Sequence, residues 1–207
     1  MTRCLTLTMI TLALMLAGTV AHADVNEKVK ACQSPKNSKE FAMKAAEGGM
    51  LEVKLSQLAQ QKATSRDVKD LARKIEQDHT AANNELMAAA KQKNIDLPSD
   101  LTVECQETYQ AFQKLDGQDF DNAYVLCLIK DHIMDIMMFQ NEAKNGTDPE
   151  IKQWAAKTLP TLREHAAHVR TVAQGIGFPM DAMAGTGQTE GARPAGARIE
   201  AAPDSKK

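Results

Sequence analysis

Four polar residues stand at positions where a helical core is normally apolar. His79, His132 and His165 each lie on the apolar stripe of a different predicted helix, and Glu52 lies on the stripe of a fourth. Imidazole nitrogens and carboxylate oxygens are ligands of zinc, iron, copper and manganese in proteins. A buried carboxylate also needs a partner. If the four helices form one bundle, these side chains make up a metal site or a site for a small polar ligand.

The stripes repeat at spacings of three and four residues, which marks one face of a helix. They predict long helices at about 39–62, 67–93, 119–145 and 149–174, and a short helix at about 101–115. Ser38 and Asp148 are the expected N-caps of the first and last helices. The predicted fold class is therefore all-α: an up-down-up-down four-helix bundle, with a short extra helix between the second and third long helices.

The four candidate ligands also lie at similar heights in such a bundle. Counted from one end, Glu52 is about 10 residues down, His79 and His132 about 13, and His165 about 16, a spread of roughly 9 Å at 1.5 Å per residue. Helical cores do not require a polar layer. We therefore interpret this layer as the functional site.

Six further polar residues lie beside the stripes or next to the four candidates. They are candidates for additional ligands or for hydrogen-bonding partners of the ligands: Asp78, Asp121, Tyr124, Asp131, Asp135 and His168. Other acidic residues point away from the stripes and are interpreted as solvated: Glu47, Glu76 and Glu164. Met134, Met137 and Met138 do not share one helix face, so we interpret them as packing residues and not as a soft-metal site.

The first and last long helices contain residues that disfavour helix. Gly48 and Gly49 lie in the middle of the first helix, where each glycine costs about 1 kcal/mol relative to alanine. Close approach of a neighbouring helix or of a ligand is the expected compensation. Pro160 is expected to bend the last helix.

The first 23 residues have the pattern of a secretory signal peptide. Arg3 precedes an apolar run, and the sequence Ala21-His22-Ala23 is a cleavage site, so cleavage is expected after Ala23. We then expect an N-terminal arm at 24–37, the bundle domain at 38–177 and a disordered tail at 178–207, which is rich in Gly, Ala and Pro. The mature chain has no further segment apolar enough to span a membrane. The expected location is the periplasm or the extracellular space.

Charge and cysteine content narrow the function classes. Without the signal peptide the chain has 24 Lys and Arg against 27 Asp and Glu, a net charge of −3. This balance does not indicate nucleic acid or anionic lipid as a partner.

Three cysteines remain, and exported proteins form disulfides. We expect a disulfide between Cys32 and Cys105, which lie near the same end of the predicted bundle, with Cys127 left over.

Several segments together resemble the DUF4142 family, in their order along the chain: Phe41–Val53, Asp78–Thr80, Asp119–Tyr124, Lys130–His132 and Thr158–His165. The resemblance covers about Phe41 to Val172. It implies an exported bacterial protein, often labelled an outer-membrane protein, with a ferritin-like four-helix fold. The biochemical function of this family is poorly defined, so the resemblance implies a fold more firmly than an activity.

The sequence differs from the di-iron pattern of ferritin-like proteins, in which two helices each carry Glu-x-x-His. Glu76 is three residues before His79 but points off the stripe, and Leu162 stands three residues before His165. We therefore do not expect an oxidase, and enzymatic activity is not favoured.

The leading hypothesis is an exported binding or stress-related protein with a transition metal (zinc, iron, copper or manganese) in the bundle core. The alternatives are a binder of a small polar metabolite, such as a polyol, and a ligand-free interaction protein.

Overall fold

The computed structural model of the chain describes residues 35–179. This part contains five α-helices and no strand: α2 (Ser38–Lys62), α3 (Arg66–Gln92), α4 (Val103–Gln113), α5 (Gly117–Asn145) and α6 (Pro149–Gly175). The predicted all-α class is confirmed, and each predicted helix bound lies within two residues of the observed one. The proposed signal peptide and most of the N-terminal arm and of the tail lie outside the described residues.

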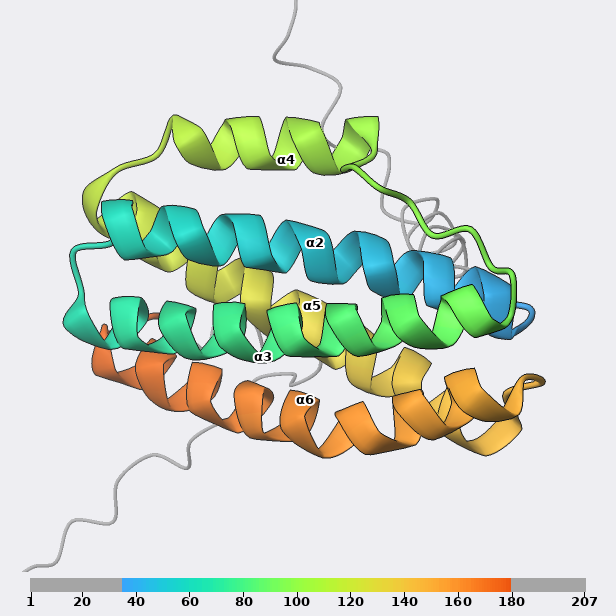
Figure 1. Ribbon diagram of the computed structural model, residues 1–207. Coiled ribbons are helices and arrows are strands. Elements are labelled where there is room, and N and C mark those ends of the chain that lie inside the picture. Colours follow the sequence, from blue (N-terminus) through green and yellow to red (C-terminus); the bar gives the residue numbers. More distant parts are fainter. Residues whose placement is uncertain (1–34, 180–207) are drawn as a thin grey trace, which may run out of the picture.

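The four long helices pack side by side, with neighbours in the order α2, α3, α6, α5 around the bundle (Figure 1). Hydrogen bonds between helix ends give their directions. Ser38, at the start of α2, contacts Thr147, which precedes α6. Lys62, at the end of α2, donates to the carbonyl oxygen of Leu115, which precedes α5. The start of α2 is thus at the same end as the start of α6, and its end is beside the start of α5.

The predicted up-down-up-down order is therefore wrong, because the chain order of the long helices is up-down-down-up. The reason is the connection at 93–116. It contains α4 and runs back along the outside of α2, so α5 begins at the same end as α3 (Figure 1). One such crossover is the arrangement of ferritin-like bundles. The sequence predicted a short helix here, but its pattern does not show how far the connection reaches.

The start of α2 differs in one detail from the prediction. Asn37, and not Ser38, is the N-cap of α2, and its side chain accepts a hydrogen bond from the N–H of Glu40. The Ser38 hydroxyl instead accepts from the N–H groups of Thr147 and Asp148, at 2.8 and 2.9 Å. Asp148 caps α6 as predicted. Ser38 thus connects the first helix to the loop between the last two.

The core divides into two apolar clusters, one toward each end of the bundle. The first contains Leu55, Leu71, Ile75, Tyr124, Leu128 and Val169, among others. The second contains Phe41, Leu86, Phe139, Trp154 and Leu162, among others. Burial of this apolar surface is the main stabilising term for such a bundle. Glu52, His79, His132 and His165 lie between the two clusters.

Gly48 and Gly49 differ in their surroundings. A Cβ at Gly49 would lie 2.3 Å from the Oδ1 atom of Asn83, so this glycine allows α2 and α3 to approach closely. A Cβ at Gly48 would meet no heavy atom of residues 35–179 within 4 Å. The close approach expected from the sequence therefore applies to Gly49, and its partner is a helix.

Phe178 places the end of the folded domain later than the predicted boundary at 177. Its side chain packs against the first apolar cluster, and its N–H donates to the carbonyl oxygen of Ala173 at 2.8 Å. The described residues beyond α6 thus still contribute to the core.

No helix in 35–179 has the length and hydropathy needed to cross a membrane.

The predicted Cys32–Cys105 disulfide stays a prediction, because Cys32 lies outside the described residues. The Cys105 thiol donates to the Glu47 carboxylate at 3.5 Å, near the end of the bundle where α2 begins. Among the described residues, Cys105 and Cys127 both have free thiols.

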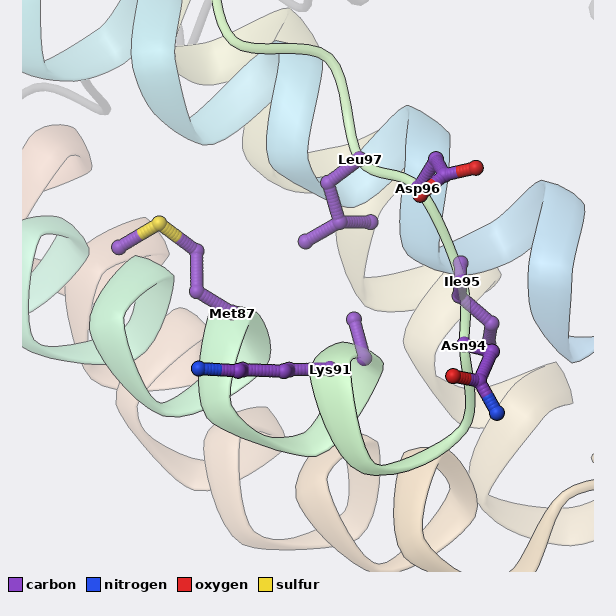
Figure 2. Close-up of a pocket in the computed structure, with 7 residues that line it drawn as sticks. Met87, Lys91, Asn94, Ile95, Asp96 and Leu97 are labelled. Atoms are coloured by element: carbon purple, nitrogen blue, oxygen red, sulfur yellow. The ribbon is translucent and has the colours of Figure 1, made fainter.

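The surface has a shallow hollow of about 350 Å³ at the end of α3. Figure 2 shows the residues around it: Met87, Lys91, Asn94, Ile95, Asp96 and Leu97. None of the predicted site residues lines this hollow.

Candidate metal centre

The three histidines meet in the middle of the bundle. The Nε2 atom of His132 is 3.2 Å from the Nδ1 atom of His165. One ring nitrogen of each of His79, His132 and His165 lies within 4.8 Å of the other two. Their exposed fractions are 7%, 0% and 2%. α3, α5 and α6 each contribute one of these imidazoles.

The corrected helix directions place these residues closer in height than the sequence predicted. From the end where α2 and α6 begin, Glu52 is 14 residues along its helix, His79 and His132 are each 13, and His165 is 16. The spread is three residues, or roughly 4.5 Å along the bundle. His132 lies near the middle of α5, so the reversed direction of this helix does not remove it from the layer.

Each histidine has its other ring nitrogen next to a hydrogen-bond acceptor. The Nε2 atom of His165 is 2.7 Å from the carboxylate of Asp78. The Nδ1 atom of His132 is 3.0 Å from the carbonyl oxygen of Leu128. The Nδ1 atom of His79 is 2.9 Å from the carboxylate of Glu52. An N–H directed at such an acceptor leaves the opposite nitrogen with its lone pair, which is the tautomer that a metal ligand needs.

Glu52 lies behind two of the histidines. Its carboxylate is 3% exposed, and its oxygens are 2.9 Å from His79 and 3.4 Å from the Nδ1 atom of His132. Neither oxygen has a hydrogen bond of good geometry within the described residues, and the same holds for the Nε2 atom of His79. Glu52 is not part of the compact group of three ligand atoms. It is placed to orient an imidazole.

Burial sets the protonation of the three histidines and of Glu52. It lowers the pKa of His79 and His132, and it lowers that of His165 to about 4 despite the opposing carboxylate of Asp78. Burial also raises the pKa of Glu52 to about 7, against the opposing effect of His132. At neutral pH the three imidazoles are neutral, which is the form that binds metal.

Three aspartates lie around the histidines. For Asp78, burial acts to raise the pKa, but hydrogen bonds from Lys74 and His165 outweigh it and hold the pKa below its usual value. Asp131 accepts a hydrogen bond from the Cys127 thiol at 3.0 Å. Burial and the nearby Glu52 raise the pKa of Asp135 well above its usual value, although its side chain is only half-buried. The site is therefore rich in carboxyl groups next to its neutral imidazoles.

The remaining sequence candidates lie farther away. Asp121 accepts hydrogen bonds from the N–H groups of Thr64 and Ser65, so it stabilises the turn between α2 and α3. Tyr124 has its hydroxyl 2.8 Å from that of Ser56, inside the first apolar cluster. His168 is exposed on α6.

Two contributors were missed in the sequence. The carbonyl oxygen of Leu128 carries no sequence signal, because every residue has one. Lys74 forms an ion pair with Asp78 at 2.7 Å. It stands four residues before this aspartate on the same helix, a spacing that brings the two side chains together and that the sequence could have indicated.

The family model of "Domain of unknown function (DUF4142)" matches residues 23–172, which is most of the chain. The chain belongs to the DUF4142 family. No curated protein sequence matches it. Among solved structures, this DUF4142 chain is similar in fold to CopM in its Cu(I)-bound form, with 20% identity, a TM-score of 0.56 and coverage of 67% of this chain and 96% of that one.

Two DUF305 proteins have the same fold as this DUF4142 chain. The protein from Streptomyces coelicolor is 14% identical, with a TM-score of 0.58 and coverage of 68% and 93% of the two chains. The fragment from Deinococcus radiodurans is 13% identical, with a TM-score of 0.59 and coverage of 70% and 97%. CopM also has Ag-bound structures that match. At these identities the similarity shows the fold alone.

Proposed function

We propose that this DUF4142 protein is an exported protein that binds one transition-metal ion through His79, His132 and His165. The observation that carries the proposal is the pair of facing nitrogens on His132 and His165, 3.2 Å apart. Their outer nitrogens are next to acceptors, at 3.0 Å from Leu128 O and 2.7 Å from Asp78. If both outer N–H groups donate, the facing nitrogens both carry lone pairs.

Two lone pairs at this distance repel unless a proton or a metal ion lies between them. The lowered pKa values of both histidines disfavour the proton. A tetrahedral ion with bonds of about 2.0–2.1 Å holds two imidazole nitrogens roughly 3.3 Å apart, close to the observed spacing. His79 supplies a third nitrogen, and its buried Nε2 atom has no hydrogen-bond partner among the described residues.

The donor set narrows the choice of metal. Three neutral imidazoles without a thiolate suit zinc or copper, and carboxylates that hold ligand histidines are a common support for such sites. The fold is also that of CopM, whose structures contain Cu(I) or Ag. Copper is therefore the first ion to test, with zinc second. For the small polar ligand, the room expected beside Gly49 is taken by Asn83, and only the space beside Gly48 is left.

The test is the metal content of the mature chain, produced without a histidine tag. We expect one equivalent of metal by elemental analysis after incubation with Cu²⁺ or Zn²⁺, and loss of most binding in His132→Ala. The matched control is His168→Ala, which removes an exposed histidine of α6 and should leave binding unchanged. Absence of stoichiometric metal, together with a polyol detected by native mass spectrometry, would support the small-ligand alternative instead.

A further inference from the structure

The candidate centre is closed to solvent. Its three histidines are at most 7% exposed, so an ion must pass between two helices to reach them. Four seams between neighbouring helices surround the site. The packing is most extensive between α2 and α3 and between α5 and α6, so the other two seams are the candidate routes. The α3–α6 seam lies next to Asp78, and the α2–α5 seam lies next to Asp131 and Asp135, which are within electrostatic reach of Glu52 on α2.

The α3–α6 seam is less favourable for a cation. Asp78 is hydrogen-bonded to His165 at 2.7 Å on its inner side. On its outer side it is paired with Lys74, also at 2.7 Å. The side chain of Lys74 is 51% exposed, so its positive charge faces the solvent at the opening of this seam. The Asp78 carboxylate is thus already paired on both sides, and it attracts an approaching cation less than an unpaired carboxylate would.

The α2–α5 seam has an opening next to the site. Gly48 stands one helical turn before Glu52 on α2, which puts both residues on one face. No heavy atom of the described residues lies within 4 Å of the position of a Cβ at Gly48, so these residues leave the space open. Glu52 beneath it is buried and its oxygens lack a well-formed hydrogen bond within 35–179. They are available to a cation that arrives from this side.

Carboxyl groups line the same seam from α5. Asp131 and Asp135 are both half-buried, so each lies between the solvent and the core. They are four residues apart, one helical turn, and Asp135 acts electrostatically on both Glu52 and His79. The observed contact of Asp131 is with the neutral Cys127 thiol. The oxygens of Asp131 and Asp135 are placed along the passage, where carboxyl groups can bind a passing metal ion.

We propose that the metal ion reaches the histidines along the α2–α5 seam, through the gap at Gly48 and past Asp131 and Asp135 to Glu52. This inference rests on the proposed function, since it concerns the route to the same site. Gly48 then has a role that Gly49 does not share. Its missing side chain keeps the passage open, and no neighbouring helix occupies the space.

The test closes the gap without changing the ligands. Gly48→Leu should slow both the loading and the release of Cu²⁺ by the same factor, on the order of tenfold, because the passage must then open before the ion can move. The dissociation constant, which is the ratio of the two rate constants, should change less than twofold. Stopped-flow quenching of Trp154, the single tryptophan, reports loading, and a strong chelator reports release.

The matched control is Lys54→Leu, which adds the same side chain at an exposed position of α2 and should leave both rate constants unchanged. The double variant Asp131→Asn and Asp135→Asn should slow loading by several-fold, because it replaces the carboxyl groups that can bind the ion along the passage. Unchanged rates in Gly48→Leu with normal Cu²⁺ binding would overturn the route but not the proposed function. Failure of the wild-type protein to bind Cu²⁺ would count against both.

Discussion

At the scale of single residues, the Glu52 carboxyl combines deep burial with contact to two histidines. Burial raises its pKa from the ordinary value of 4.5 to about 7. In the metal-free protein the folded state therefore holds this proton more tightly than the unfolded state. The stabilisation that this provides is fully present below about pH 4.5 and is lost as the pH rises through about 7.

Replacing Glu52 by Gln should remove this dependence. The free energy of unfolding of metal-free Glu52→Gln, relative to wild type, should rise by roughly 3 kcal/mol between pH 4.5 and pH 8. Urea denaturation at the two pH values measures this difference. Glu164→Gln, at an exposed glutamate of α6, is the control. Parallel pH curves for wild type and Glu52→Gln would contradict a buried, titrating Glu52.

The histidines titrate in the opposite sense. Burial lowers their pKa values in the folded state, so the stability that neutral imidazoles contribute is present above about pH 6.5 and falls as the pH drops from there toward the folded pKa, about 4 for His165. We expect the affinity for Cu²⁺ to change little between pH 7.5 and 6.5 and to be strongly reduced near pH 4. Competition titrations at several pH values measure it. A midpoint at or above pH 6.5 would show that these imidazoles titrate as exposed ones do.

At the scale of the helix, two adjacent glycines of α2 form a matched pair. Gly48→Ala should stabilise the protein by about 0.5–1 kcal/mol, because alanine is the better helix former and meets no atom there. Gly49→Ala should destabilise it, because the new Cβ collides with Asn83 of α3. Thermal unfolding of both variants gives the comparison. Equal shifts in the same direction would mean that the close approach of α2 and α3 does not constrain Gly49.

At the scale of the whole molecule, a bound ion would join three of the four long helices. α3, α5 and α6 each supply one imidazole, so an ion that binds only the folded state raises its stability. At a free Cu²⁺ concentration 100 times the dissociation constant, the gain should be about 2.7 kcal/mol. Scanning calorimetry with and without Cu²⁺ measures this gain. Adding Cu²⁺ should raise the Tm of the wild type and leave the Tm of His132→Ala unchanged. An equal rise in both proteins would indicate binding elsewhere.

The end of the folded domain gives a second prediction at this scale. Truncation after Pro179 should leave the Tm within a few degrees, because the later sequence has no apolar period to bury. Truncation after Gly177 should lower the Tm further, since it also removes Phe178 from the first apolar cluster. Circular dichroism melts of the two shortened chains test this. A large loss of helix in the longer of the two would show that the tail contributes to the fold.

Local pattern was enough to predict most of the helices and the meeting of the histidines. The three-and-four spacing of apolar residues determines which face of each helix is buried, so His79, His132 and His165 had to point inward whatever the helix order. His132 lies near the middle of α5. Reversing this helix therefore leaves the histidine at nearly the same height, and the predicted layer does not depend on the predicted direction.

Only the tertiary structure decided the helix directions and the separate roles of the carboxylates. The direction of α5 depends on how far the connection at 93–116 reaches, which is a matter of packing against α2 and leaves no period in the sequence. The position of a carboxylate on its helix also does not tell whether it binds an ion directly or hydrogen-bonds to the outer nitrogen of a ligand histidine. Glu52 was predicted as a ligand and lies 2.9 Å from the outer nitrogen of His79. Asp121 was predicted near the site, but it stands eleven residues before His132 on α5, about 16 Å along the helix in either direction. The direction of α5 decides only that Asp121 meets the turn between α2 and α3, to which it hydrogen-bonds.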